Sequence, residues 1–512
     1  MNTRMKSLAA ILTATGIMSL PLYAAAVSHQ DVQNLSTEAT SLKKTVKNLK
    51  SQANALESEV DHANKAVSRA NARSKAVKGM TGKQLAQLIR EEKEYLPFDL
   101  DVPGQAFVST GPYIGVPFQF AGNDFVVNSP SVNQDVQLLG IRKSISEQLR
   151  IMGGEIVKEP YHSHLLLSGV VEGQVDYVNN GGSPSTTDIN VSNVSLDAFI
   201  LGPSPWMLGF IEFTYADNTP ASDVFGGTSS YRVSDSRLFV NKAFVTMGNF
   251  SESPVYGTFG QYYVPFGVYS SVMVSSPLTK FLTRTKARAI LLGLQQQDPK
   301  SAFFGAGYIF RGDSHAASVS KINNGGLNLG YKFKGNIFKG KIGAGVIGNI
   351  ADSGGMQTAG NFQNAEQLVH RVPGYNLNTV MSIGQHLDFI GEYVAASTSF
   401  NPTNMSYNGN GAKPWAFDLE AAYSVDLFET KPSSFGVGYS QSNEALALGL
   451  PLNRVSVVVN TSWWRNTLQS LEFRRDREYA ASDTASGAGS VTTPAASGKI
   501  DRAVTAQFDY YF

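Results

Sequence analysis

Apolar residues follow two different periods along the chain, and the change of period divides it into two parts. Within residues 32–70 they recur three and four positions apart, whereas beyond residue 163 they alternate with polar residues. The first spacing places side chains along one stripe of a helix, and the second places them on one face of a strand. The pattern therefore predicts a helical N-terminal segment followed by a long β domain.

A secretory signal is predicted ahead of the helical segment. Arg4 and Lys6 precede an apolar stretch from Leu8 to Leu20, and small residues follow at Ala24–Ala26. A basic start, a short apolar run and a small-residue cleavage site are typical of a signal peptide. The run is too short for a membrane anchor and no stop-transfer pattern follows it, so the sequence predicts export.

The helical segment keeps its apolar positions in register over roughly six heptads, as a left-handed coiled coil requires. These positions are Val32, Leu35, Ala39, Leu42, Val46, Leu49, Ala53, Leu56, Val60, Ala63, Val67 and Ala70. So narrow a stripe needs a partner helix in water, which favours a parallel homo-oligomer. Dimer and trimer both stay open, because the many alanines weaken the preference that Val and Leu give. The alternative is a single helix lying on another periplasmic surface.

The chain after the heptads has less regular patterning. Gly79 ends the long helix, and a second short helix is predicted from Thr81 to Pro97, with Gln84 completing a capping box. Residues 98–162 are rich in Gly, Pro and Asn and show no clear period. We predict that they connect the stalk to the β domain or constrict its pore.

The pattern of the β domain predicts a membrane barrel. Residues 165–177 and 415–427 alternate apolar and polar positions, and similar runs repeat to the C-terminus. Charged residues make up 16% of the chain, against roughly 25% in typical soluble proteins. Gly (48), Phe (29) and Tyr (21) are abundant, while mean hydropathy is −0.13. Strands with one face in lipid and one facing a wet lumen explain this combination.

The predicted fold is an all-β transmembrane barrel of about 16 antiparallel strands, preceded by an α-helical coiled coil. The strands are expected to begin near 164, 188, 206, 236, 254, 286, 301, 325, 341, 375, 387, 415, 433, 453, 467 and 499. Gly/Ser/Asn-rich extracellular loops are expected at 179–187, 217–235, 352–373, 399–413 and 480–498. The predicted domains are 1–26 (signal peptide), 27–97 (periplasmic coiled-coil stalk and short helix), 98–162 (connector or constriction) and 163–512 (outer-membrane barrel).

The C-terminus carries the sharpest local signal. Val504, Ala506, Phe508, Tyr510 and Phe512 alternate with polar or smaller positions, and the last residue is aromatic. A terminal strand of this kind resembles the assembly signal of outer-membrane barrels, so Phe508, Tyr510 and Phe512 are expected to be recognised by the barrel-assembly machinery. The predicted location is the outer membrane of a Gram-negative-type envelope, with the lipid bilayer as the main partner.

The composition excludes several kinds of functional site. Cysteine is absent, which excludes disulfides, thiolate metal sites and a cysteine nucleophile. A net charge of +1 gives no basic face for nucleic acid. His162 and His164 share one strand face but lack a third ligand nearby, so no metal site is predicted. We expect no cofactor and no enzymatic activity.

Inward-facing charges are the candidate substrate pathway. The expected cations are Arg284, Lys286 and Arg288 on one segment, with Lys332, Lys334 and Arg474 on other strands; the expected opposing acids are Glu172, Asp176, Glu212, Asp388, Glu392, Asp418 and Glu420. Opposed basic and acidic walls orient polar solutes and select by charge. The plainer interpretation is that the charges only keep the lumen hydrated.

The whole arrangement resembles the LbtU family of siderophore porins. The resemblance rests on the signal peptide, coiled coil and barrel, on Gly260-Gln261-Tyr262-Tyr263-Val264-Pro265-Phe266-Gly267, and on Phe508-Asp509-Tyr510-Tyr511-Phe512. It implies import of a ferric siderophore of polycarboxylate type without TonB-type energy coupling. The chain agrees in showing no N-terminal plug domain of about 150 residues and in being too short for a transporter of about 22 strands.

Two other functions stay open. A general or anion-preferring porin, for example for phosphate, would have the same fold and would conduct small anionic solutes without binding a ferric complex. A structural envelope protein would instead use its stalk to tether the outer membrane to the cell wall. An outer-membrane enzyme is the weakest alternative, because no catalytic constellation stands out.

Overall fold

A computed structural model describes most of the β domain. The described residues are 133–151, 164–181, 184–201, 204–216, 237–298, 300–316, 321–335, 337–364, 367–384, 386–428, 431–464, 466–490 and 496–512. The predicted signal peptide and the coiled-coil stalk with its short helix lie outside these residues, as do residues 98–132 and 152–162 of segment 98–162.

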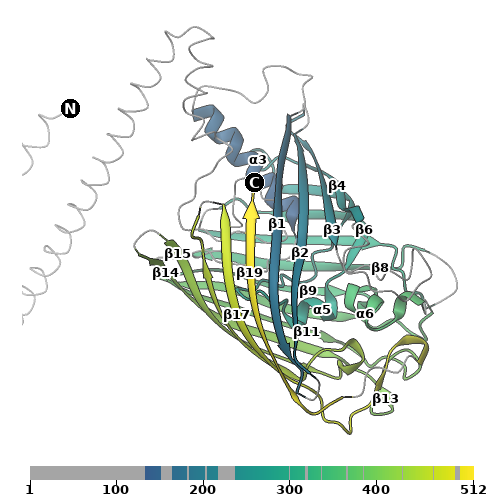
Figure 1. Ribbon diagram of the computed structural model, residues 1–512. Coiled ribbons are helices and arrows are strands. Elements are labelled where there is room, and N and C mark those ends of the chain that lie inside the picture. Colours follow the sequence, from purple (N-terminus) through teal and green to yellow (C-terminus); the bar gives the residue numbers. More distant parts are fainter. Residues whose placement is uncertain are drawn as a thin grey trace, which may run out of the picture. The chain divides into compact units, whose positions relative to one another are not determined.

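Sixteen antiparallel strands form one closed barrel (Figure 1). They are β1 (His164–Asn179), β2 (Thr186–Leu201), β3 (Met207–Ala216), β4 (Arg237–Gly248), β5 (Val255–Tyr263), β6 (Lys286–Gln295), β7 (Ser301–Phe310), β8 (Asn324–Lys334), β9 (Phe338–Ile347), β10 (Gly374–Ile383), β11 (Leu387–Ala396), β14 (Trp415–Leu427), β15 (Lys431–Asn443), β16 (Asn453–Thr461), β17 (Thr467–Arg477) and β19 (Ile500–Tyr511). Each strand pairs with its neighbour in sequence, and β1 pairs with β19 to close the barrel. Closure leaves no free edge, as a sheet in lipid requires.

The lengths of the connections orient the barrel. At one end β8 and β9 are joined by residues 335–337 and β14 and β15 by 428–430, whereas at the other end β9 and β10 are joined by 348–373. Outer-membrane barrels have short periplasmic turns and longer extracellular loops. The end that holds the short turns and the C-terminus is therefore periplasmic.

The extracellular loops contain small elements of their own. These are the 3-10 helices η2 (Ile350–Asp352), η3 (Phe362–Asn364), η4 (Leu446–Leu448) and η5 (Ala488–Ser490), the helix α6 (Gly354–Thr358), and a three-stranded sheet of β12 (Ser406–Tyr407), β13 (Asn410–Gly411) and β18 (Ala485–Ser486). Two other helices are α3 (Gln134–Ile151) and α5 (Leu278–Thr283). None of the helices in the described part of the chain is long and apolar enough to cross a membrane.

The two faces of the barrel differ in polarity as the alternation predicts. On β14, Leu419 and Tyr423 point outward and are exposed, whereas Asp418 and Glu420 point inward and are buried. Strand β8 repeats this arrangement, with Leu329 outward. Exposed apolar side chains cover the outer face of most strands, so the outside of the barrel suits lipid and the inside suits polar groups.

Aromatic side chains gather near both ends of the outer face. Towards the extracellular end, Tyr375, Tyr393 and Trp415 lie in successive contact, with ring centroids 5.9 and 6.2 Å apart. Towards the periplasmic end, Trp464 and Phe508 have centroids 6.4 Å apart. Such girdles mark the two membrane–water interfaces of transmembrane barrels. The fold is thus that of an outer-membrane barrel.

The sequence prediction of fold class is confirmed in its main part. All sixteen strands begin within three residues of the predicted starts. Phe508 and Tyr510 point outward from β19, while Tyr511, which follows Tyr510, points inward and is fully buried. Phe512 bonds the opposite strand through its backbone, with Gly169 N donating to its carbonyl at 2.8 Å.

Gly260 on β5 is a position that requires glycine. Its φ is +145°, and an added Cβ would lie 2.3 Å from the carbonyl oxygen of Ala243 on β4. An L-residue there would force the β4–β5 pairing apart. Gly257 on the same strand would place a Cβ no closer than 3.5 Å to its nearest neighbour, the carbonyl oxygen of Leu291.

We predict that Gly260→Ala lowers the free energy of unfolding by at least about 1–3 kcal/mol, the usual range for a residue held in a disfavoured backbone conformation. Gly257→Ala is the matched control and should change it little. Urea unfolding of the refolded barrel, followed by the mobility difference between folded and unfolded protein on gels, measures both. Equal midpoints for the two variants would show that the strain is absent.

Candidate functional site

The segment between β5 and β6, residues 264–285, folds into the barrel and carries α5 (Figure 1). Its hydrogen bonds go to strands on the far side of the lumen, β11, β14, β16 and β17. We call residues 264–285 the constriction loop. Because it crosses the lumen, every solute path through the barrel must pass beside it.

Glu392 on β11 is the most heavily bonded anchor of the constriction loop. Its carboxylate accepts from the backbone N–H groups of Val268 and Tyr269 at 2.8 and 2.9 Å and from the Thr279 hydroxyl at 3.0 Å. Asn376 on β10 donates a fourth bond at 2.8 Å. A buried carboxylate needs such partners to offset its desolvation.

Two more inward glutamates repeat this bonding further along the loop. Glu420 on β14 accepts from the Ser271 hydroxyl at 2.6 Å and from Val272 N at 2.7 Å. Glu472 on β17 accepts from Ser275 through its backbone N at 2.8 Å and through its hydroxyl at 2.5 Å. Three strands therefore hold one loop by the same chemistry.

An apolar contact supports the polar anchors. Val272, Met273 and Val274 of the constriction loop pack with four inward-facing apolar residues of the barrel wall, which are Val380, Ile390, Ala422 and Val458. Gly436 and Gly438 on β15 make room for Val272 and Met273, since an added Cβ would lie 2.7 and 3.0 Å from their side chains. The loop is thus packed as well as bonded.

The constriction loop is held in a strained conformation at its first anchor. Tyr269 is fully buried with φ of +50°, which is rare for a bulky residue. Its N–H bond to Glu392 and its hydroxyl contact with Thr283 at 3.0 Å fix it there. At Gly267 an added Cβ would lie 2.7 Å from a Glu392 oxygen, so glycine permits the close approach.

The first half of helix α3 lies against the inner wall near the periplasmic end of the barrel. Its Asp135 accepts from the Thr258 hydroxyl on β5 at 2.7 Å, and Arg142 donates to the carbonyl oxygens of Met207 and Ser204 at 2.8 and 2.7 Å. Leu138 and Leu139 on the helix belong to the apolar cluster of inward residues on β2–β7. Of segment 98–162, the described helix thus lies against the inner wall.

Four lysines form a basic patch on the inner wall at β8 and β9. In the β8–β9 pair, Lys332 is opposite Lys341 and Lys334 is opposite Lys339. All four share the inward face of their strands, and Lys332 and Lys334 stay exposed to water inside the barrel. We call them the lysine quartet. Like charges directly opposite each other are unfavourable unless an anion lies between them.

No carboxylate of the described residues forms an ion pair with Lys332, Lys334 or Lys339, and Lys332 only lies 5.7 Å from the ring of Phe304. Several of the inward acids, by contrast, have partners within the wall or the constriction loop. Glu212 pairs with Lys242, and Asp476 receives two bonds from Arg454 at 2.8 and 3.0 Å.

The structure places the other residues of the predicted pathway as follows. Glu172, Asp176, Glu212, Lys332, Lys334, Asp418, Glu420 and Arg474 all lie on inward faces. Arg474 is 3.2 Å from Asp476, and Asp418 accepts from the Ser440 hydroxyl. Much of the predicted acidic wall thus bonds within the wall, and Glu420 anchors the loop.

The predicted lumen position of Lys286 and Arg288 is wrong. Both lie on the face of β6 that continues as Ile290 and Leu292, which are 52% and 66% exposed on the outside of the barrel. Arg284 is not on this strand but caps α5, with its guanidinium 4.3 Å from the ring of Tyr263. The alternation identified two faces, and the inner one was assigned incorrectly.

Sequence reasoning missed three parts of the site: the constriction loop, the anchor Glu472, and the lysines 339 and 341. A signal for the lysines was present, since Lys-x-Lys occurs on both sides of the short turn 335–337. The loop also carries a buried lysine, Lys280. Burial, together with nearby Arg284, lowers the pKa of Lys280 well below its usual value, while the carboxylate of Glu172 acts in the opposite direction.

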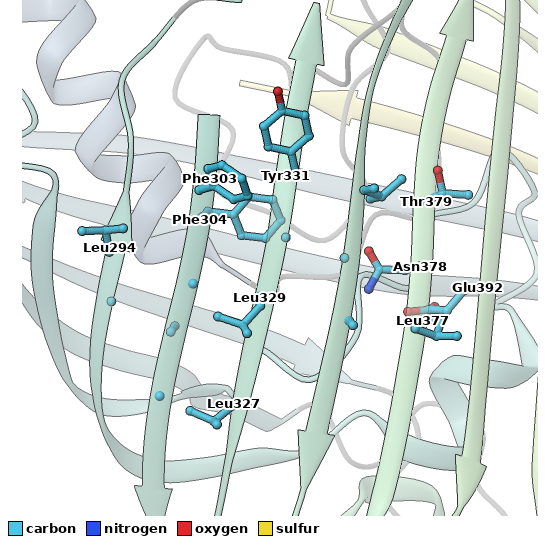
Figure 2. Close-up of a pocket in the computed structure, with 18 of the residues that line it drawn as sticks. Leu294, Phe303, Phe304, Leu327, Leu329, Tyr331, Leu377, Asn378, Thr379 and Glu392 are labelled. Carbon is cyan, nitrogen blue, oxygen red and sulfur yellow. The ribbon is translucent and has the colours of Figure 1, made fainter. Parts of the chain in front are cut away.

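A groove of about 1210 Å³ lies outside the lumen, on the lipid-facing surface over β6–β11 and β14. Figure 2 shows Phe303, Leu327, Leu329 and Leu377 gathered along it, with Asn378 and Glu392 behind. Its lining is almost wholly apolar because outward residues predominate. It therefore belongs to the membrane face and not to the solute path.

No metal centre is apparent in the part of the chain that the structure describes, where no three His, Asp or Glu side chains are grouped to hold an ion. Of the histidine pair considered in the sequence, His162 lies outside the described residues.

A closed sixteen-stranded barrel with an apolar outer face, a polar lumen and an inward-folded loop defines a porin-like outer-membrane barrel. The chain belongs to the UPF0422 protein family. It is 36% identical over 409 residues to the UPF0422 protein of Coxiella burnetii (strain RSA 493 / Nine Mile phase I), covering 79% of this chain and 84% of the relative. A UPF0422 protein of Legionella pneumophila (strain Lens) is 36% identical over 423 residues, covering 79% and 76%.

No family model matches the chain. Among solved structures, an anion-selective porin from Comamonas acidovorans aligns with 69% of this chain and 100% of its own at 10% identity and a TM-score of 0.42. OmpF of Salmonella typhi in complex with daunomycin aligns with 68% and 97% at 12% identity and a TM-score of 0.43.

We predict that Glu392→Gln loosens the constriction loop. A glutamine offers one accepting oxygen, and its amide group would face N–H donors, so the loss is about 1.5–3 kcal/mol of anchoring. Faster proteolysis within residues 264–285 and a larger single-channel conductance should follow.

Asp426→Asn is the control for this substitution, since Asp426 is an inward, exposed carboxylate of β14 at the periplasmic end. It should leave both measurements unchanged. Conductance and protease resistance of Glu392→Gln equal to those of the unchanged protein would refute the anchoring role.

Proposed function

We propose that this protein is an outer-membrane porin that admits anionic solutes, and that its cargo is a ferric siderophore of polycarboxylate type, taken up without TonB-type energy coupling. The observation that carries the anionic preference is the lysine quartet on β8 and β9. Partners would be the outer-membrane bilayer and the anionic cargo.

The distribution of charge supports this preference. The inward carboxylates Glu392, Glu420 and Glu472 accept hydrogen bonds from the constriction loop, so they are turned towards the loop and away from the remaining solute path. The four lysines stand opposite each other in pairs. Among the described acids, Asp388 interacts electrostatically with Lys339 and Glu392 with Lys341, so four cations face two nearby carboxylates and an excess of positive charge remains beside β8 and β9. A positive wall in a water-filled channel with low-dielectric surroundings concentrates anions.

The choice of cargo rests on two arguments of unequal weight. A polycarboxylate complex carries several anionic oxygens on one rigid body and can contact several ammonium groups together. The chain resembles siderophore porins in its signal peptide, heptads and terminal strand, and this resemblance implies the same class of cargo. A small anion such as phosphate would satisfy the first argument alone, and is the alternative.

We predict that replacing Lys332, Lys334 and Lys339 together with Gln lowers anion over cation selectivity and raises the half-saturating concentration of an anionic cargo on the order of tenfold, the effect expected from removing a focusing field. The reversal potential across a planar bilayer in a KCl gradient measures the first. Replacing Arg475, Arg477 and Arg502, which lie on the outer faces of β17 and β19, removes equal charge outside the lumen and should change neither.

The cargo itself is tested by uptake into proteoliposomes. The vesicles are offered a ferric polycarboxylate siderophore, phosphate or a neutral sugar of similar size to the ferric complex. Saturable entry of the ferric complex that depends on the three lysines supports the siderophore porin. Saturable entry of phosphate alone favours the phosphate porin, and equal unsaturated entry of all three leaves a general diffusion channel.

We also propose that residues 27–97 form a periplasmic coiled-coil stalk that joins identical chains and follows a signal peptide, while 98–162 connects it to the barrel. The heptads of residues 32–70 are the support. Deleting residues 32–77 should abolish the oligomer seen by sedimentation and leave single-channel conductance unchanged. Detachment of the outer membrane in cells, with uptake unchanged, would instead favour a tether as the main function.

A further inference from the structure

Two arginines stand side by side on the outer surface at the extracellular rim. Arg288 shares the outward face of β6 with Ile290, and Arg311 follows the outward Ile309 at the end of β7. Since Ala289 is opposite Phe310 in the β6–β7 pair, Arg288 and Arg311 are the next opposed positions. Two guanidinium groups thus meet where the barrel leaves the membrane.

Their charge is not neutralised within the described part of the barrel. Neither arginine is in an ion pair there, and Arg288 only donates to the side-chain oxygen of Gln261 at 3.3 Å. Lys286, two residues away on the same face, adds a third cation and donates to Asn241 at 2.9 Å. Opposed like charges are unfavourable, and an anion bound between them would offset this.

An apolar groove begins at the same two arginines and runs over the lipid-facing surface. Its volume is about 690 Å³, and Arg288 and Arg311 belong to its lining. The remaining outward lining is mostly apolar and includes Val240, Ala243, Phe259, Ile290, Ile309 and Ile322. Phe259 is 65% and Ile309 51% exposed, so the groove opens towards lipid. A cationic head above an apolar channel fits an amphiphile with an anionic headgroup.

We propose that this groove binds a phosphorylated lipid of the outer leaflet, with a phosphate held by Arg288 and Arg311 and an acyl chain lying along Phe259 and Ile290. The long loops identify this rim as extracellular, so the lipid comes from the outer leaflet. Arginine suits the role because its planar fork binds phosphate oxygens through two parallel hydrogen bonds. The site is separate from the lumen and from the lysine quartet.

The test is native mass spectrometry of the full-length protein in detergent, titrated with bisphosphorylated lipid A. The double variant Arg288→Gln/Arg311→Gln should bind roughly tenfold more weakly or worse, the loss expected from removing charge-assisted hydrogen bonds. The matched control is Arg475→Gln/Arg502→Gln. These arginines are also opposed on outward faces, but neither lines the groove, so affinity should stay unchanged.

A second variant separates the lipid from a free anion. Ala243→Trp leaves every arginine in place and fills the groove from β4, so it should weaken lipid binding, while millimolar inorganic phosphate should not compete with lipid. Dephosphorylated lipid A should bind poorly to the unchanged protein.

Each contrary result overturns the proposal in a distinct way. An equal loss of lipid affinity in both double arginine variants would mean that lipid is attracted by rim charge in general. Normal lipid binding by Ala243→Trp with competition by phosphate would mean a free-anion site. Undiminished binding after loss of Arg288 and Arg311 would remove the site altogether.

Discussion

A carboxylate buried in the wall of a membrane barrel must be hydrogen-bonded, and Glu392 satisfies this requirement with a loop from across the lumen. Two backbone N–H groups, a hydroxyl and an amide converge on it. The bonds fix Tyr269 in a disfavoured backbone conformation and bring Gly267 against the wall. Together with Glu420 and Glu472, this group sets the position of the constriction loop and hence the shape of the remaining path.

Once the loop is anchored, the charges of the lumen divide into two classes. Acids on β11, β14 and β17 are structural, because each accepts bonds from the constriction loop. The lysines of β8 and β9 are not used in this way. Hydrogen bonds from the loop orient these carboxylates without removing their charge, while the lysine quartet gathers four cations on the wall of β8 and β9. The proposed anion preference therefore rests on where folding places the charges as much as on composition.

Strand alternation allowed the barrel to be predicted from the sequence almost completely, because each strand is half in lipid and half in a polar lumen. The extracellular loops were identifiable from Gly, Ser and Asn. The constriction loop was not, since Val272-Met273-Val274 is an apolar run that resembles a strand and gives no sign of folding inward. Its anchors on β11, β14 and β17 lie more than a hundred residues away, and only the closed barrel brings them together.

The incorrect assignment of Lys286 and Arg288 to the lumen has a physical cause, and the same cause explains why basic residues lie at the extracellular rim. In β6 both faces are rich in apolar residues, so alternation alone cannot say which face is inside. Ile290, Leu292 and Leu294 identify the outer face, because their side chains are exposed on the surface that meets lipid. Lys286 and Arg288 alternate in step with them and therefore share that face. Basic residues on that face are favourable only beyond the hydrocarbon, where headgroup phosphates can solvate them. The same two charges that contribute nothing to the lumen therefore mark the level at which the barrel meets the outer leaflet.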